Sequence, residues 1–208
     1  MHDGSTLATE VAILRAAGRH DAASADLVRT ALHDAEPRLR VLALRVGGQR
    51  SLLTPADLSA ALGDRDADVR REALTLLARR DDADDPVDEA VGLLGDTDAL
   101  VAESAAFALG ERPAPGAVPA LARVARAHDD ARCREAAVAA LGSLGDPAGR
   151  DAVIAALDDR PSVRRRAVIA LAAFEGPEVE AALSRAHQDR DWQVRAAAAE
   201  LDDEPPAP

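Results

Sequence analysis

One pattern recurs six times along the 208-residue chain, with a period of 30 to 32 residues. Each copy contains an aspartate, then an apolar residue, usually an arginine directly after it, and an alanine three positions beyond the arginine. The apolar members are Leu39, Val69, Val101, Cys133, Val163 and Val194. A repeat of this length is typical of units that cannot bury an apolar face alone and therefore stack into a solenoid.

Two further columns of the repeat are almost constant. Arginine follows the apolar residue in five copies and Ala102 replaces it in the third; the five are Arg40, Arg70, Arg134, Arg164 and Arg195. The alanine is present in all six copies, at Ala43, Ala73, Ala105, Ala137, Ala167 and Ala198. Because aromatic residues make up only 1% of the chain, the core must consist of alanine, leucine and valine. Such small side chains require closely spaced helices.

Each copy divides into two helical stretches, which we name the A helix and the B helix. The A helices are expected near residues 22–33, 55–63, 86–95, 116–127, 147–158 and 177–187. The B helices carry the repeated pattern and are expected near 37–47, 67–80, 99–111, 131–144, 161–174 and 192–201. A further helix near residues 5–17 precedes the first copy and is expected to close that end of the stack.

The B helices have clear start signals. Four positions before the arginine slot stand Glu36, Asp66, Asp98, Asp130, Arg160 and Asp191, so five of the six residues are acidic. Acidic side chains are favoured there because they accept hydrogen bonds from unpaired amides and interact with the positive end of the helix dipole. Pro37 and Pro161 follow two of these residues, and proline at the first helical position loses no hydrogen bond.

Charge and composition disfavour several kinds of partner. The net charge of -12 disfavours binding to nucleic acid, whose affinity depends on many neutralised phosphates. No apolar run approaches the length of a membrane span, and the first residues do not resemble a secretion signal. With a single cysteine, Cys133, no internal disulfide can form, and this residue is expected in the core. We therefore expect a cytoplasmic protein without membrane contact.

The stretch LGSLGDPAGRDAVIAALDDRPSVRRRAVIALAAF, residues 141–174, resembles HEAT repeats of the short, phycobilisome-lyase-like class. The resemblance extends from about residue 20 to 201. It implies an all-α fold: a right-handed α-solenoid of about six two-helix repeats with an N-terminal capping helix. The expected organisation is a capping helix and turn at 1–21, six repeats at 22–201, and a disordered acidic, proline-rich tail at 202–208. The resemblance implies little about function, because these repeats serve scaffolds, inhibitors, chromophore lyases and a hydroxylase.

A helical wheel of the B helix places the repeated arginine beside the apolar stripe, at the edge of the core. An aspartate six positions upstream repeats with it, except in the fourth copy, where His128 stands. We expect these residues to form a ladder that pins the loops of neighbouring units, because arginine binds carboxylates through several donors. Ligand binding is the alternative. The ladder comprises Asp34, Arg40, Asp64, Arg70, Asp96, Arg134, Asp158, Arg164, Asp189 and Arg195.

The opposite face of the B helices does not repeat, so a partner could be recognised there. In the resembled family this face lines the concave side of the solenoid. We expect a partner-binding surface of apolar and basic residues, at Arg38, Arg45, Arg71, Leu100, Phe107, Arg132, Arg165, Ile169 and Trp192.

Each part of this surface has an alternative interpretation. Phe107 could belong to the core, and Trp192 could be a lid on the last unit, which we favour over an interface anchor. The arginines could simply neutralise acidic side chains on adjacent units.

No catalytic constellation is apparent. The histidines at His2, His20, His33, His128 and His187 are dispersed through the array, and none is followed by glutamate as in the hydroxylase of this fold. We find no glycine-rich phosphate loop and no activated nucleophile. We therefore expect no catalytic residue, no metal and no cofactor. The sequence favours a monomeric, non-catalytic scaffold or adaptor that binds a protein partner along the concave B-helix face. The alternative is a lyase-like or cofactor-maturation factor.

Overall fold

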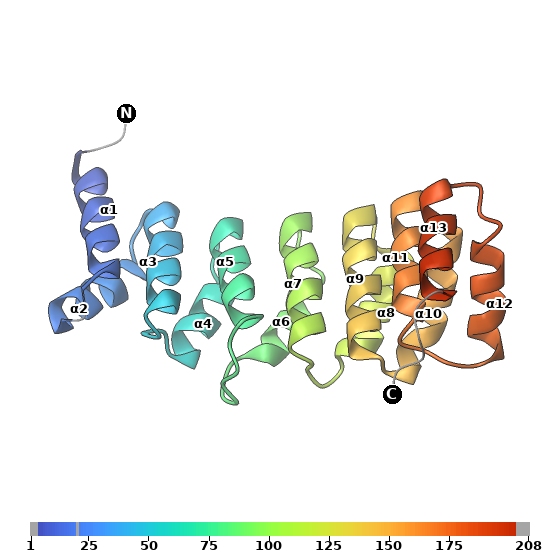
Figure 1. Cartoon of the computed structure of the whole chain (residues 1–208). Helices are drawn as coiled ribbons and strands as arrows, with labels where there is room; N and C mark the ends of the chain where they lie inside the picture. Colours follow the sequence, from blue (N-terminus) through green and yellow to red (C-terminus); the bar gives the residue numbers. More distant parts are fainter. Residues whose placement is uncertain (1–3, 20, 203–208) are drawn as a thin grey trace. The chain divides into compact units, whose positions relative to one another are not determined.

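The computed structural model describes residues 4–19 and 21–202. These residues form thirteen α-helices and two 3₁₀ helices, and they contain no strand (Figure 1). The chain divides into two compact units, Met1–Ala90 and Val91–Pro208. Each unit is a short all-α solenoid in which helices stack pairwise. Asp202 ends the last helix, and the rest of the tail that we expected to be disordered lies outside the described residues.

The first unit contains a row of three B-type helices with A helices behind them. The B-type row is α1 (Gly4–Ala17), α3 (Pro37–Gln49) and α5 (Ala67–Leu77), and the A helices are α2 (Ala22–Ala31) and α4 (Pro55–Leu62). Helix α6 (Val87–Leu93) crosses the boundary between the units. Because α1 packs against α3 as α3 packs against α5, the N-terminal helix occupies the place of a B helix (Figure 1).

The second unit repeats this arrangement. Its B helices are α7 (Ala99–Glu111), α9 (Ala131–Leu144), α11 (Pro161–Leu171) and α13 (Trp192–Asp202), and each packs against the next. Its A helices are α8 (Ala117–Ala127), α10 (Arg150–Ala155) and α12 (Pro177–Ala186). The single helix expected over 147–158 is wrong, because 3₁₀ turns η1 (Pro147–Gly149) and η2 (Ala156–Asp158) flank α10. Pro147 and Gly149 are poor residues for a helix interior.

Aspartates begin the B helices as predicted. The side chains of Asp66, Asp98 and Asp130 accept hydrogen bonds from backbone amides in the first turn of α5, α7 and α9. Glu36 and Arg160 occupy the same position before α3 and α11 without a side-chain cap. In both cases the next residue is proline, whose fixed φ suits the start of a helix.

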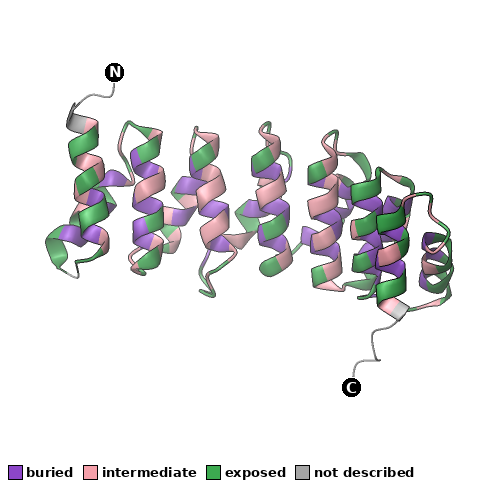
Figure 2. Cartoon of the chain, turned by 45° about the horizontal axis from the view of Figure 1, so that its top comes forward, coloured by how far each residue is buried: buried purple, intermediate pink, exposed green. Residues whose placement is uncertain are grey.

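The repeated columns form the core. All six apolar residues of the pattern are buried, and the alanine three positions after the arginine slot is completely buried in every copy. Figure 2 shows buried residues on the inner sides of the helices and exposed residues on their outer sides. Cys133 lies in this core as predicted, donates to the carbonyl of Ala99 at 3.1 Å, and has its pKa raised to about 11 by burial.

Two glycines allow the B helices of the second unit to approach closely. A Cβ atom at Gly142 of α9 would lie 2.7 Å from the Cβ of Ala170 on α11. A Cβ atom at Gly110 of α7 would lie 3.0 Å from the Cα of Ala140 on α9. Because real Cβ atoms do not approach as closely as 2.7 Å, glycine is required at position 142 for the observed spacing of α9 and α11, and a Cβ atom at position 110 would press tightly on α9.

Candidate functional site: an arginine ladder and an exposed helix row

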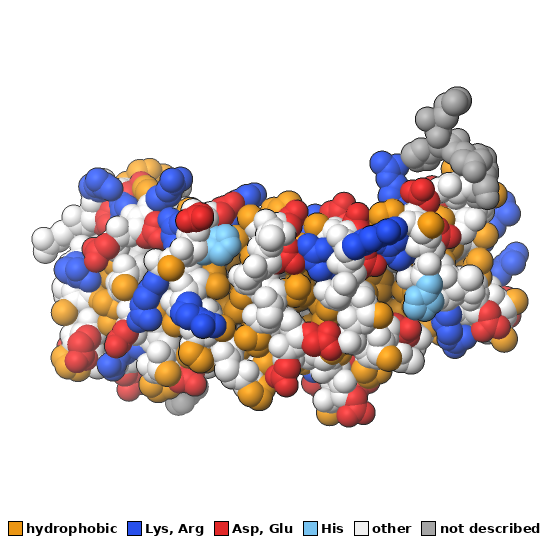
Figure 3. All heavy atoms as spheres, turned by 180° about the vertical axis from the view of Figure 1, so that it is seen from behind, with side chains coloured by type: hydrophobic (Ala, Val, Ile, Leu, Met, Phe, Trp, Pro, Cys, Tyr) orange, Lys and Arg blue, Asp and Glu red, His pale blue; other side chains and the backbone are white. Residues whose placement is uncertain are grey.

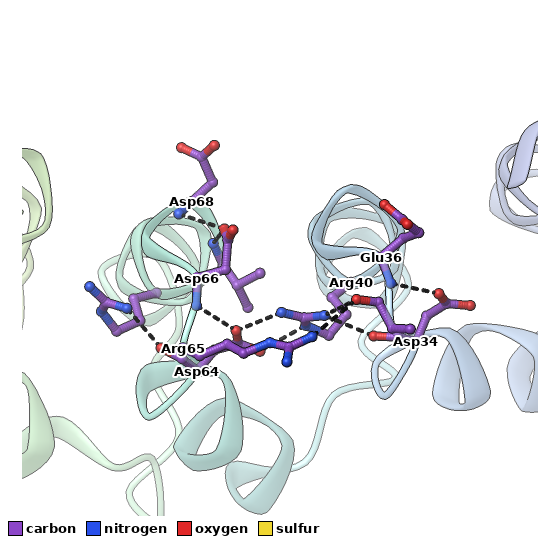
Figure 4. A network of polar contacts seen from close by, with 10 residues as sticks. Asp34, Glu36, Arg40, Asp64, Arg65, Asp66 and Asp68 are labelled. Atoms are coloured by element: carbon purple, nitrogen blue, oxygen red, sulfur yellow. Dashed lines mark hydrogen bonds and ion pairs between the residues drawn. The ribbon is translucent and has the colours of Figure 1, made fainter. Parts of the chain in front are cut away.

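Arg40 joins two consecutive interhelical loops of the first unit (Figure 4). Its Nε and Nη2 donate to both carboxylate oxygens of Asp64, at 2.8 and 2.7 Å. Its Nη1 donates to the carbonyls of Asp34 and Ala35, at 2.8 and 3.1 Å. Each rung of the ladder therefore ties the loop before one B helix to the aspartate before the next.

The second unit contains two equivalent rungs. Arg134 donates to both oxygens of Asp159 at 2.6 and 2.7 Å, and to the carbonyl of His128. Arg164 donates to both oxygens of Asp189 at 2.9 and 2.8 Å. The side chains of Arg164 and Asp189 are 4% and 15% exposed, so this ion pair is shielded from water.

The other predicted members of the ladder hold their own loops. Arg70 donates to the carbonyl of Asp64 at 2.8 Å, and Arg195 donates to the carbonyl of Asp189 at 2.7 Å. Asp96 accepts from the backbone N–H of Asp98 at 2.8 Å. These contacts are equivalent to the part of each rung in which a side chain bonds to the backbone of the loop before its own B helix.

The prediction of Asp158 is wrong by one residue, because Asp159 binds the arginine. The loop before α11 is shorter than the others, so Arg164 contacts the carbonyl five positions upstream instead of six. Asp158 is the last residue of η2 and is exposed. Sequence alone does not distinguish the two adjacent aspartates.

Two residues depart from the repeated pattern: Ala102 replaces an arginine and His128 replaces an aspartate. Both belong to the same rung. Since each arginine binds the acid of the following copy, the partner position of Ala102 is His128. Both ion-pair residues are thus replaced together. Ala102 is completely buried, and His128 Nδ1 accepts from the N–H of Asp130 at 3.1 Å, as Asp189 does from Asp191. Histidine therefore retains the loop contact of the aspartate without its charge. Pairing each arginine slot with the next copy would have revealed this in the sequence.

Hydrogen bonds stabilise the charged forms of the ladder residues. Arg134 lowers the pKa of Asp159, and Arg164 lowers that of Asp189. Burial alone would raise the pKa of Asp64, but hydrogen bonds from Arg40 and a backbone N–H outweigh it and the pKa is lowered. The hollow of about 400 Å³ beside Arg40 offers few free donors because that guanidinium is already bonded within the chain. The geometry therefore favours a structural role over ligand binding.

The lowered pKa values predict acid sensitivity. A carboxylate with a depressed folded-state pKa contributes stability above its unfolded value of about 4, and this contribution is lost as pH falls through the folded value. We expect the urea concentration at the midpoint of unfolding to decrease as the pH is lowered below about 4. In Asp189→Asn the midpoint should be lower at neutral pH and should fall less on acidification. Equal pH dependence of the two proteins would contradict this role for Asp189.

The large apolar residues of the predicted partner surface are exposed. Phe107 and Trp192 are 57% and 66% exposed, so the core interpretation of Phe107 and the lid interpretation of Trp192 are both wrong. Leu100 and Ile169 are each 38% exposed. These four residues lie on α7, α11 and α13 of the second unit. We name them the apolar row.

Most of the predicted basic residues are paired within the chain. Arg45 of α3 contacts Glu72 of α5 at 2.8 Å, which is the neutralising role given as the alternative. Arg71 and Arg132 contact Asp68 and Asp130 near the starts of their own helices. The pKa of Asp130 is lowered to about 2 by Arg132. Arg38 and Arg165 are exposed.

Charges of both signs also mix on the face shown in Figure 3, where apolar side chains lie between them.

A groove of about 440 Å³ lies between α9 and α11. Small side chains form most of it, and its lining is Ala139, Gly142, Ser143, Arg166, Ile169, Ala170, Ala172 and Ala173. Ala139 occupies the repeat position that holds Phe107 on α7 and Ile169 on α11, so two large side chains flank a small one. This groove cannot be recognised in the sequence, because it depends on the close approach of α9 and α11.

The described residues contain no group of three or more side chains suited to bind a metal. Among them, His33, His128 and His187 lie on separate loops or helix ends, while His2 and His20 lie outside the described residues. None of the helices in the described part of the chain combines the length and apolar character needed to cross a membrane.

Several solved structures share this fold. YibA of Escherichia coli has a TM-score of 0.66 at 17% identity, over 91% of this chain and 72% of that one. An engineered protein has a TM-score of 0.64 at 19% identity, over 85% of this chain and 96% of that one. The complex of CpcE and CpcF of phycocyanin lyase from Nostoc sp. PCC7120 has a TM-score of 0.59 at 20% identity, over 85% and 75%. No curated protein matches the sequence.

A model of HEAT repeats matches residues 54–142, 90–162 and 150–201, which together span most of the chain. The matched residues include five of the six copies of the repeated pattern completely, and the matches agree with the stacked helix pairs of both units. The chain therefore belongs to the HEAT repeat family.

Proposed function

We propose that this protein is a non-catalytic scaffold that binds a protein partner along the B helices of its second unit. The observation that carries the proposal is the apolar row, whose four large side chains are exposed on three B helices of one unit. Exposed apolar side chains grouped on one surface and bordered by polar residues are typical of protein-binding sites. Scattered single apolar residues would not support it.

The groove between α9 and α11 gives this surface a shape. A large apolar side chain of the partner fits over Ala139, between Phe107 and Ile169, where it would be shielded from water on both sides. Interface energy is concentrated in such central, well-packed anchors. Arg45, Arg71 and Arg132 are satisfied within the chain, so apolar contact rather than a basic field provides most of the affinity.

The family supports a scaffold role. HEAT repeats present extended surfaces built from neighbouring units, and fold alone does not imply an activity. One structure with this fold is a complex of two proteins, CpcE and CpcF. No contact in the described residues favours the lyase-like alternative over partner binding.

The test begins with cross-linking in the native host, which identifies a partner and the residues that it contacts. Phe107→Asp and Ile169→Asp should each weaken binding of that partner by about tenfold or more, because a buried charge replaces an apolar anchor. Both residues are exposed, so the melting temperature should change little.

The matched control is Ala181→Asp, which introduces the same charge at an exposed position of helix α12. It should leave binding unchanged. Cross-links that map to the A helices, or binding that survives both Phe107→Asp and Ile169→Asp, would reject this surface.

A further inference from the structure

A second apolar surface lies on α1, at the opposite end of the chain from the apolar row. Its outward face exposes Leu7, Val11 and Leu14, which are 55%, 37% and 53% exposed. Its inward face buries Ile13 and Ala16 in a cluster with residues of α2 and α3. The helix is thus apolar on both sides. Helices of this kind normally lie between two neighbours, but α1 has helices of its own unit on only one side.

The far end of the second unit differs. Apart from Trp192 at its first position and Ala199, the exposed residues along α13 are polar: Gln193, Arg195 and Glu200. Head-to-tail stacking of two chains would place the apolar face of α1 against these polar residues of α13.

The exposed face of α1 has the pattern of a parallel two-stranded coiled coil. Leu7, Val11 and Leu14 are spaced four and three residues apart, which places valine at an a position and leucine at two d positions. This combination favours two parallel strands. Glu10 then occupies a g position and Arg15 the following e position. In a parallel pair, Glu10 of one helix faces Arg15 of the other, and the symmetry forms this ion pair twice.

We infer that a second copy of this chain covers the apolar face, with the two α1 helices parallel about a twofold axis. Each of Leu7, Val11 and Leu14 contacts its own counterpart, as an isologous interface requires. An antiparallel pair would instead oppose glutamate to glutamate. The contact runs from Leu7 to Leu14, about 11 Å along the axis of the 14-residue helix, which is small for a dimer interface. The association is therefore weak and depends on concentration, unlike the monomer expected from sequence.

Sedimentation equilibrium of the whole protein tests this inference. The native chain should dimerise reversibly, and Leu7→Glu with Leu14→Glu should be monomeric without a lower melting temperature, because both residues are exposed. Glu10→Arg and Arg15→Glu should each weaken the dimer by about tenfold, because each places like charges across the interface. The double variant with both Glu10→Arg and Arg15→Glu should dimerise as the native chain does. A native chain that stays monomeric at high concentration would reject the second copy as the occupant.

Disulfide formation tests the orientation. Leu7→Cys, Val11→Cys and Leu14→Cys should each cross-link two chains in a parallel pair, whereas only a residue near the axis does so in an antiparallel one. The native Cys133 does not interfere, because it is buried. Ser184→Cys, at an exposed position of α12, is the control and measures the rate of cross-linking by random collision. Cross-linking confined to Val11→Cys would overturn the parallel arrangement, and rates equal to that of Ser184→Cys would overturn the interface. Neither result bears on the apolar row.

Discussion

Replacement of Arg164 by alanine is expected to lower the free energy of unfolding by about 3 kcal/mol. The change leaves Asp189 charged and largely buried without its partner, and it removes the donor to the carbonyl of Asp159. Removing one member of a shielded ion pair costs more than the pair contributes, because the remaining charge keeps its desolvation cost. Urea unfolding followed by circular dichroism measures the difference.

The neighbouring arginine provides the control. Arg165 is exposed and forms no ion pair among the described residues, so Arg165→Ala should change the free energy of unfolding by less than about 0.5 kcal/mol. The two variants remove the same side chain from adjacent positions of α11. Similar losses in both would show that the shielded rung does not stabilise the fold.

The incomplete rung predicts a second large effect. Ala102→Arg alone should destabilise the protein by about 3 kcal/mol or more, because it places an unpaired charge at a completely buried position. Adding His128→Asp supplies the carboxylate that the other arginines bind. The double variant should therefore be more stable than the sum of the single changes by roughly 1 to 3 kcal/mol. A double-mutant cycle in urea measures this coupling.

His128→Asp alone should have a modest effect. Aspartate can accept the hydrogen bond from the N–H of Asp130 that His128 now accepts, as Asp189 does in the last rung. Its added charge has no arginine partner, so some loss is expected. A coupling energy near zero in the cycle would mean that positions 102 and 128 do not form a rung.

The sequence predicted features that depend on the repeat. Helix positions, the buried columns and the exposure of the variable face follow from periodicity, because stacked copies place equivalent residues in equivalent surroundings. The ladder was found for the same reason. Its error at Asp158 arose where one loop is shorter, since a repeat of 30 to 32 residues does not specify where the difference in length falls.

Other features depend on distances between helices. The groove requires the contact of Gly142 with Ala170, and a single glycine in a helix does not indicate which residue approaches it. The pairing of Arg45 with Glu72 requires the spacing of α3 and α5. The apolar face of α1 does not follow from the repeat, because α1 precedes the first copy and joins the B-type row only through its packing on α3.

The direction of the rungs affects how such an array can lengthen in evolution. A gene duplication that copies residues 159–188 adds an acceptor for the preceding arginine and a donor for the following aspartate, so no charge is left over. A duplication that begins between Asp159 and Arg164 keeps one aspartate before each arginine only if it ends between Asp189 and Arg195, the equivalent place in the next copy. Tandem copying in whole periods therefore keeps every arginine matched to an aspartate, whereas at Ala102 and His128 both halves of one rung depart from the pattern.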